Sequence, residues 1–298
     1  MKLAAILFNK GCTIGDTLRD KDFDTPADIE RFDSLSYGAD PVWNVLDVYR
    51  PKEAAGKKLP VILNVHGGGW VYGTTVTYQY YCMSLAQQGF AVVSYNYHLA
   101  PKYKFPTYLL ETNAVAHWIY KNADKYGLDT NNMFGVGDSA GGQMLGLYAA
   151  ICAEPEISKK FGIEPPEGMK FNAVGLNCGA YDVNLLDWKN GLNILIHDTI
   201  QDKDYKKWQP YMSVLEHVTP NFPPAYVMTA TADFLKDEAP KLTAKLEEYK
   251  IPYVYKMYGM ENGKKTENLM HVFHCNIALP AARQCNKDEC DFFKKYIR

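Results

Sequence analysis

The chain has 298 residues, of which 47% are hydrophobic and 22% are charged, a composition typical of one large globular domain. The formal net charge of -2 gives no electrostatic reason to expect a nucleic acid or an anionic membrane as a partner. No apolar run approaches the length of a membrane-spanning helix, so we expect none.

The N-terminal segment, residues 1–30, begins with a short apolar run that ends after Phe8. This run is shorter than the core of a secretory signal peptide, and no clean cleavage site follows it, so we expect a structured segment. The seven cysteines are scattered without the spacing of a metal site. We therefore expect free thiols, a cytoplasmic location, no metal and no other cofactor.

Short runs rich in β-branched and aromatic residues predict about eight strands. Two of them predict antiparallel strands at one edge, and helical patterns separate most of the others. Alternating strands and helices predict an α/β fold with a mostly parallel central sheet and helices on both faces. The predicted strands lie at residues 34–37, 45–49, 61–65, 91–95, 133–136, 173–176, 225–228 and 253–257, and the main predicted helices at 106–125, 239–249 and 281–297.

One interval, residues 180–222, lacks a good strand and contains Trp188, Trp208 and Tyr211. An interval of this length is either a substrate-binding insertion or a plain helical connection, and the sequence leaves both possibilities open. We expect the whole chain, residues 1–298, to form one domain. If the interval is a substrate-binding insertion, it forms a small cap over the active site together with residues 1–30. Trp70, Trp188, Trp208 and Tyr211 would then line the substrate pocket.

Ser139 is the middle residue of Gly-Asp-Ser-Ala-Gly, which spans residues 137–141. The stretch follows the predicted strand at 133–136 and precedes a helix-compatible run, which is the strand–turn–helix context of a nucleophile elbow. Small residues two positions either side of the serine allow a strained, tight turn. Chance alone would supply the five-residue motif in roughly one chain in ten of this length, so other features must support it.

Three consecutive glycines, Gly67, Gly68 and Gly69, follow the predicted strand at 61–65. Their uncovered backbone amides can donate hydrogen bonds to an anion, although a flexible glycine turn is the alternative. No Lys-Ser/Thr pair follows them, which argues against a phosphate-binding loop. Because such a loop supplies half of the oxyanion hole in hydrolases with a nucleophile elbow, we expect these glycines and Ala140 to bind the oxyanion.

The acid and the base are expected to follow the nucleophile in the order serine, acid, histidine. Asp233 follows a late strand and is favoured over Asp237, which lies where the next helix begins. His271 ends a long polar loop and is favoured over His274, which is nearer the terminal helix. In the predicted mechanism His271 takes the proton of Ser139, while Asp233 fixes the tautomer of the imidazole and stabilises its charged form.

These motifs resemble those of the hormone-sensitive-lipase-like esterases, a family of the α/β-hydrolase fold. The resemblance covers roughly residues 40–298 and implies the triad Ser139, Asp233 and His271. It also implies that Gly68, Gly69 and Ala140 form the oxyanion hole. The stretches that carry it are His-Gly-Gly-Gly-Trp at 66–70, Tyr-His-Leu-Ala-Pro at 97–101, Phe-Pro at 105–106, Gly-Asp-Ser-Ala-Gly-Gly at 137–142, Asp-Phe-Leu-Lys-Asp at 233–237 and His-Val-Phe at 271–273.

The chain departs from this family pattern in three places. His98 stands where the family usually has arginine, and Thr112 follows Glu111 where it usually has aspartate. Together these two changes are expected to remove a structural ion pair. Val272 stands where the family usually has glycine, so we expect the loop beside the base to be set differently.

The predicted function is that of a serine carboxylesterase that hydrolyses short-chain acyl, acetyl or small aromatic esters through an acyl-enzyme. Amide hydrolysis is the alternative, because His-Gly-Gly-x-Trp also resembles the oxyanion motif of arylformamidases. A ligand-binding protein that has lost catalysis is a third hypothesis, disfavoured because every triad member is present. The expected partner is a small-molecule ester, with no nucleic acid and no membrane, and a homodimer is left open.

Overall fold

The computed structural model describes residues 3–183 and 205–298. Its centre is an eight-stranded sheet of order β1-β2-β4-β3-β5-β6-β7-β8. β2 pairs antiparallel with β1 and β4, and the remaining neighbours run parallel, as the sequence predicts. The strands are β1 (Ile29–Ser36), β2 (Val45–Pro51), β3 (Leu59–Val65), β4 (Ala91–Tyr95), β5 (Leu128–Asp138), β6 (Ala173–Asn177), β7 (Ala225–Ala230) and β8 (Tyr253–Tyr258).

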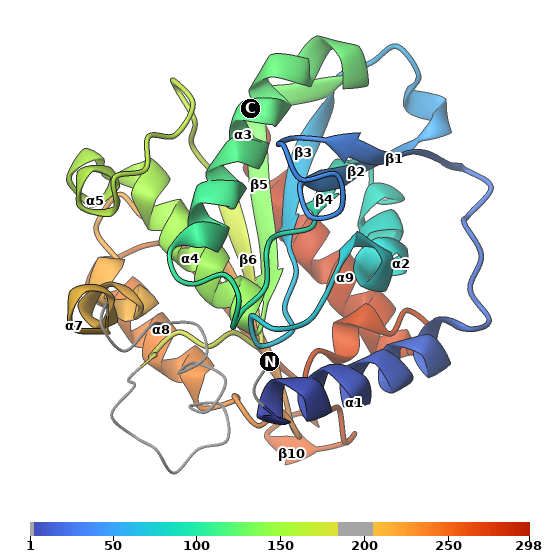
Figure 1. Ribbon diagram of the computed structural model, residues 1–298. Coiled ribbons are helices and arrows are strands. Elements are labelled where there is room, and N and C mark those ends of the chain that lie inside the picture. The colour runs from blue at the N-terminus through green and yellow to red at the C-terminus, as the bar shows by residue number, and fades with distance from the viewer. Residues whose placement is uncertain (1–2, 184–204) are drawn as a thin grey trace.

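Helices cover both faces of the sheet and form a separate hydrophobic core on each (Figure 1). The side chains of β3 alternate between these cores, so that Leu63 belongs to the same core as Leu145, while Ile62 belongs with Phe293 to the core on the opposite face. Helices α3, α4 and α8 contribute to the first core, and α2 and α9 to the second. The helices are α1 (Leu3–Asp20), α2 (Thr75–Ala86), α3 (Thr107–Tyr126), α4 (Ala140–Ala153), α5 (Pro155–Phe161), α7 (Tyr205–Trp208), α8 (Glu238–Glu248) and α9 (Pro280–Lys294).

Short elements complete the connections between these helices and strands. A small hairpin, β9 (Met260–Glu261) with β10 (Lys264–Lys265), follows β8. Four 3₁₀ turns lie in loops of the described ranges: η1 (Lys52–Ala54), η3 (Gln209–Tyr211), η4 (Val214–His217) and η5 (Phe273–Cys275). Within the predicted 180–222 interval, the described part contains α7, η3 and η4 and no strand.

The loops that follow the parallel strands β3, β5 and β7 meet at one edge of the sheet, where ligands bind in open α/β sheets. They carry the three glycines, Ser139 and Asp233 respectively. α1, dark blue in Figure 1, lies below the sheet at this edge, and several of its side chains adjoin Ser139. No helix in the described ranges combines the length and apolar character that a bilayer crossing requires.

Candidate active site

Ser139 occupies the sharp turn between the end of β5 and the start of α4. Its backbone angles, φ 53° and ψ -119°, are unfavourable for any residue with a side chain, so the turn stores strain. The Ser139 N–H donates to the carbonyl of Asn177 in β6 at 3.0 Å, which anchors the turn to the sheet. A Cβ atom on Gly141 would lie 2.0 Å from the carbonyl oxygen of Val65, so only glycine allows this approach of α4 to β3.

His271 connects the serine to a buried carboxylate. Its Nε2 lies 2.9 Å from Ser139 Oγ, and its Nδ1 lies 2.6 Å from Asp233 Oδ1. Ala232 and Met270 form an isolated parallel β-bridge that joins the loops carrying Asp233 and His271. Each of the two bridge residues immediately precedes one of these triad residues. The structure therefore brings together the three residues that the sequence singles out, within hydrogen-bond reach of one another.

Asp233 is 2% exposed and accepts two further hydrogen bonds besides that with His271. The N–H of Leu235 donates to it at 2.8 Å and the hydroxyl of Thr229 at 2.7 Å. Burial acts to raise the pKa of Asp233, but the hydrogen bonds and the histidine outweigh it, and the pKa lies below its ordinary value. The group is thus a fixed carboxylate at neutral pH. Sequence reasoning missed Thr229, because no local pattern marks a threonine that faces a carboxylate.

The two rival residues lie elsewhere. Asp237 stands at the N-terminus of α8, as expected for an acidic residue that favours a helix start. His274 is completely buried, and burial lowers its pKa to about 3. Its ring packs edge-on against Tyr81 at 5.0 Å, within the core beneath α2. In the part of the chain that the structure describes, neither residue forms a hydrogen bond with Ser139, so the geometry favours Asp233 and His271.

The glycine loop forms a tight turn beside the serine. Gly68 and Gly69 have φ of 108° and 58°, and the Gly68 carbonyl accepts the N–H groups of Val71 and Tyr72. Within the described ranges, no acceptor contacts the N–H of Gly68 or Gly69. Ala140 is the first residue of α4, so its N–H also has no acceptor inside the helix.

Gly67 differs from the other two glycines. Its N–H donates to the hydroxyl of Tyr78 at 3.0 Å. This donor is occupied, so the three amides that remain for an oxyanion are those of Gly68, Gly69 and Ala140.

A cavity of about 280 Å³ adjoins Ser139. Most of its surface is apolar, with Phe8 and Cys12 from α1 on one side and Phe234 and Val272 near the base. Its polar part includes Asp16, which accepts a hydrogen bond from Tyr72 at 2.8 Å. No sequence pattern marks these α1 side chains as pocket residues, because residues 1–30 are recognisable from the sequence only as a structured segment.

The aromatic residues that we expected in the pocket are placed differently. Trp70 is 1% exposed, and its indole N–H donates to Gln143 at 3.1 Å inside the core. Trp208 and Tyr211 pack edge-on against each other at 5.9 Å, at the margin of the core on the α3 and α4 face. These three side chains do not line the described cavity at Ser139. Trp188 lies outside the described residues.

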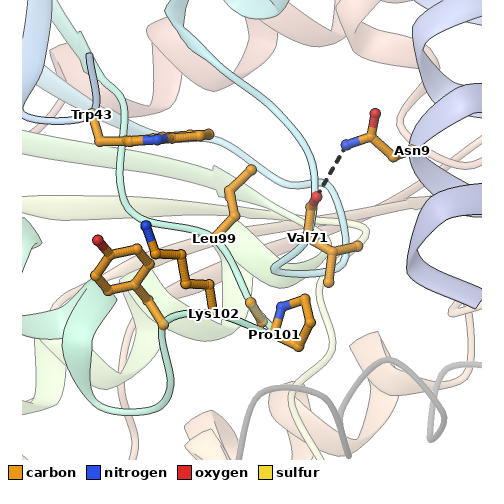
Figure 2. Close-up of a pocket in the computed structure, with 8 residues that line it drawn as sticks. Asn9, Trp43, Val71, Leu99, Pro101 and Lys102 are labelled. Carbon is orange, nitrogen blue, oxygen red and sulfur yellow. Dashed lines mark hydrogen bonds between the residues drawn. The ribbon is translucent and has the colours of Figure 1, made fainter. Parts of the chain in front are cut away.

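A second and more open hollow, of about 560 Å³, borders another part of α1. Figure 2 shows Trp43, Leu99 and Lys102 around it, and Asn9 donating to the carbonyl of Val71, at 3.2 Å. None of the triad residues or oxyanion glycines lines this hollow. The chemistry therefore belongs to the smaller cavity.

His98, which stands where the family usually has arginine, contacts two carboxylates. Its Nδ1 contacts the carboxylate of Glu111, and its Nε2 lies 3.3 Å from the carboxylate of Asp40. The imidazole thus uses both of its nitrogens to contact carboxylates, while the expected loss of an ion pair between positions 98 and 112 stays a prediction. Thr112 instead shares a hydrogen bond with the hydroxyl of Tyr95 at 2.6 Å.

Val272, next to the base, has φ 51° and ψ 32°. This left-handed conformation suits glycine and is strained for a β-branched residue, at a cost of about 1–3 kcal/mol. The valine therefore occupies a backbone conformation in which glycine would be unstrained.

Comparisons with known proteins place the chain in a family. The BD-FAE family model matches residues 46–246. Esterase LipC of Mycobacterium tuberculosis is 36% identical over 149 residues, which cover 49% of this chain and 36% of that protein. The versiconal hemiacetal acetate esterase of Dothistroma septosporum is 28% identical, covering 71% of this chain and 67% of that protein. The match thus spans about a third of the length of LipC.

Among solved structures, esterase B from Lactobacillus rhamnosis superposes with a TM-score of 0.87 and 22% identity. The superposition covers 98% of this chain and 93% of that one, so the two share the fold over nearly their whole lengths. The fold is that of the α/β-hydrolases, as the sequence predicts. The family match establishes that the chain belongs to the BD-FAE family, among the hormone-sensitive-lipase-like α/β-hydrolases.

Proposed function

We propose that this protein is a serine carboxylesterase that hydrolyses short-chain acyl, acetyl or small aromatic esters. One observation carries the proposal: His271 lies 2.9 Å from Ser139 Oγ on one side and 2.6 Å from Asp233 Oδ1 on the other. The named esterases among its relatives support the same reaction class.

The proposed reaction proceeds in two halves. Ser139 Oγ attacks the ester carbonyl carbon as His271 Nε2 takes its proton, and the N–H groups of Gly68, Gly69 and Ala140 stabilise the oxyanion. The histidine then returns the proton to the alcohol oxygen, the carbon–oxygen bond breaks, and the acyl group remains on the serine. In the second half, the histidine takes a proton from water, the hydroxide attacks the acyl carbon, and the serine leaves with that proton.

The size of the cavity at Ser139 favours a substrate with a small acyl group. Its volume of about 280 Å³ is below the range typical of pockets for drug-sized ligands. Phe8, Cys12 and Phe234 give it apolar walls, which suit an alkyl or aryl acyl group. We propose that α1 acts as part of a cap over this cavity, so that the N-terminal helix limits acyl length.

A panel of p-nitrophenyl esters, from acetate to dodecanoate, tests the proposal. We expect turnover of the short esters to fall steeply with chain length, and Ser139→Ala to lose at least about a thousandfold in kcat. Ser84→Ala is a matched control, because this hydroxyl lies away from the triad, where it donates to the carbonyl of Tyr81 at 2.7 Å and accepts the amide of Asn286 at 3.2 Å. Full activity of Ser139→Ala would refute the proposal, and faster turnover of an aryl formamide than of p-nitrophenyl acetate would favour amide hydrolysis.

A further inference from the structure

Asp138, the residue before the nucleophile, is connected to the glycine loop through Tyr78 of α2. The Tyr78 hydroxyl donates to Asp138 Oδ2 at 2.8 Å and accepts the N–H of Gly67 at 3.0 Å. Asp138 is 1% exposed and Tyr78 is 7% exposed, so water does not compete strongly for these bonds. These two hydrogen bonds connect Gly67 with Asp138, which lies 71 residues further along the sequence.

The glycine loop also packs directly against Asp138. A Cβ atom on Gly67 would lie 2.5 Å from Asp138 Oδ2, 2.8 Å from its carbonyl oxygen and 3.1 Å from the hydroxyl of Tyr78. Glycine is therefore required at this position by the carboxylate behind it. The same contact fixes the distance between the start of the glycine loop and the nucleophile turn.

The link between Gly67 and Asp138 connects the two segments that supply the proposed oxyanion hole. Gly68 and Gly69 follow Gly67 directly, and Ala140 lies two residues beyond Asp138. Donors must be held within a few tenths of an ångström of their productive positions, because a displacement of about 1 Å costs about a hundredfold in rate. A rigid link between the two loops would supply this positioning.

We propose that Asp138 and Tyr78 are positioning residues that hold the glycine loop against the nucleophile turn and thereby set the geometry of the oxyanion hole. The inference rests on the proposed esterase function. Neither side chain contacts the reacting atoms in the proposed mechanism. Tyr78 holds the backbone N–H of Gly67, and Asp138 holds the hydroxyl of Tyr78.

The charges of the pair suit this role. Burial keeps the pKa of Tyr78 well above its ordinary value, so its hydroxyl remains a donor. Burial also raises the pKa of Asp138, to about 6, which the hydrogen bond from Tyr78 partly offsets. At pH 8 the carboxylate is ionised, and the hydrogen bond from the tyrosine is charge-assisted and strong.

Tyr78→Phe is the most direct test, because it keeps the ring and removes only the hydroxyl. We expect kcat on p-nitrophenyl acetate to fall about 10–100-fold with KM within about twofold, since the oxyanion forms only in the transition state. The inhibition constant of a trifluoromethyl ketone, which forms an oxyanion on the serine, should rise by a similar factor. Asp138→Ala should show the same pattern, whereas Asp138→Asn should retain much of the activity because its amide oxygen still accepts the hydrogen bond. The double variant Tyr78→Phe with Asp138→Ala should lose no more kcat than either single variant, because both substitutions break the same link.

Tyr81→Phe is the matched control. Tyr81 lies one turn further along α2, is 1% exposed, and donates to Glu289 at 3.2 Å rather than to Asp138. This variant also loses a buried hydroxyl, so its loss of stability should resemble that of Tyr78→Phe, while its kcat should remain within about twofold of the wild-type value.

Amide hydrogen exchange separates this inference from the proposed function. A peptide covering residues 66–72 should exchange faster in Tyr78→Phe than in the wild type and should be unchanged in Tyr81→Phe. Unchanged exchange in Tyr78→Phe, or a kcat equal to that of Tyr81→Phe, would overturn the positioning role even if the esterase is confirmed. An inactive wild type would refute the esterase proposal, and the exchange result would still decide whether Tyr78 and Asp138 hold the loop.

Discussion

Glu289 in α9 offers a quantitative test of the packing behind the active site. Its side chain is 1% exposed, accepts the Asn177 amide at 2.9 Å and accepts the Tyr81 hydroxyl at 3.2 Å. Gly175 leaves room for it, because a Cβ atom there would lie 1.8 Å from Glu289 Oε1. Burial raises the pKa of Glu289 from 4.5 to about 7, although its two donors act to lower it.

The direction of the pH effect follows from proton binding. Between about pH 4.5 and pH 7 the folded protein holds a proton on Glu289 that the unfolded chain releases, so this group's contribution to stability falls as the pH rises. Well above pH 7 Glu289 is also ionised in the folded protein, so its contribution to stability has been lost completely. A difference of two to three pKa units corresponds to about 3 kcal/mol at pH 8, of which about 2 kcal/mol develops above pH 5.

Glu289→Gln removes the ionisation and keeps the shape of the side chain. We expect its free energy of unfolding, relative to the wild type, to increase by about 2 kcal/mol between pH 5 and pH 8. Urea unfolding at several pH values measures this difference. Glu247→Gln, at an exposed position of α8, should show no such trend. Parallel pH profiles of Glu289→Gln and the wild type would refute the reasoning.

Three further substitutions probe the site itself. Asp233→Asn should lower kcat on p-nitrophenyl acetate by roughly 10³–10⁴-fold with little change in KM, and a loss below tenfold would contradict its role as the triad acid. Gly15→Leu should reduce the kcat/KM ratio of butyrate to acetate, because Gly15 lines the cavity, whereas Gly11→Leu at a comparable open position of α1 should leave that ratio unchanged. Val272→Gly should leave the free energy of unfolding within about 1 kcal/mol of the wild type by calorimetry, because relief of backbone strain offsets lost contacts, and a loss above about 3 kcal/mol would show that the valine is not strained.

Most of the sheet was predictable because its central strands are buried on both faces and therefore appear as short apolar runs separated by helices. The order of Ser139, Asp233 and His271 was predictable because a nucleophile elbow restricts where the acid and base can follow. The distances between these three side chains were not predictable, since the bridge between Ala232 and Met270 forms only where two loops meet in space.

The pocket was not predictable from its aromatic content. Tryptophan and tyrosine serve the core as well as ligand sites, and here Trp70 and Tyr211 pack away from the cavity at Ser139. The walls come instead from α1, whose Phe8 and Cys12 have no pattern that distinguishes a cavity from a core. The role of Tyr78 was likewise hidden, because its partners are set by tertiary packing.

Covalent trapping tests the central claim most directly. The wild type would be incubated with a fluorophosphonate, which reacts with activated serines, and examined by intact-protein mass spectrometry and peptide mapping. We predict a single adduct on Ser139, no adduct in Ser139→Ala, and much slower labelling in His271→Ala. An adduct on another residue, or equal labelling of Ser139→Ala, would contradict the assignment of Ser139 as the nucleophile.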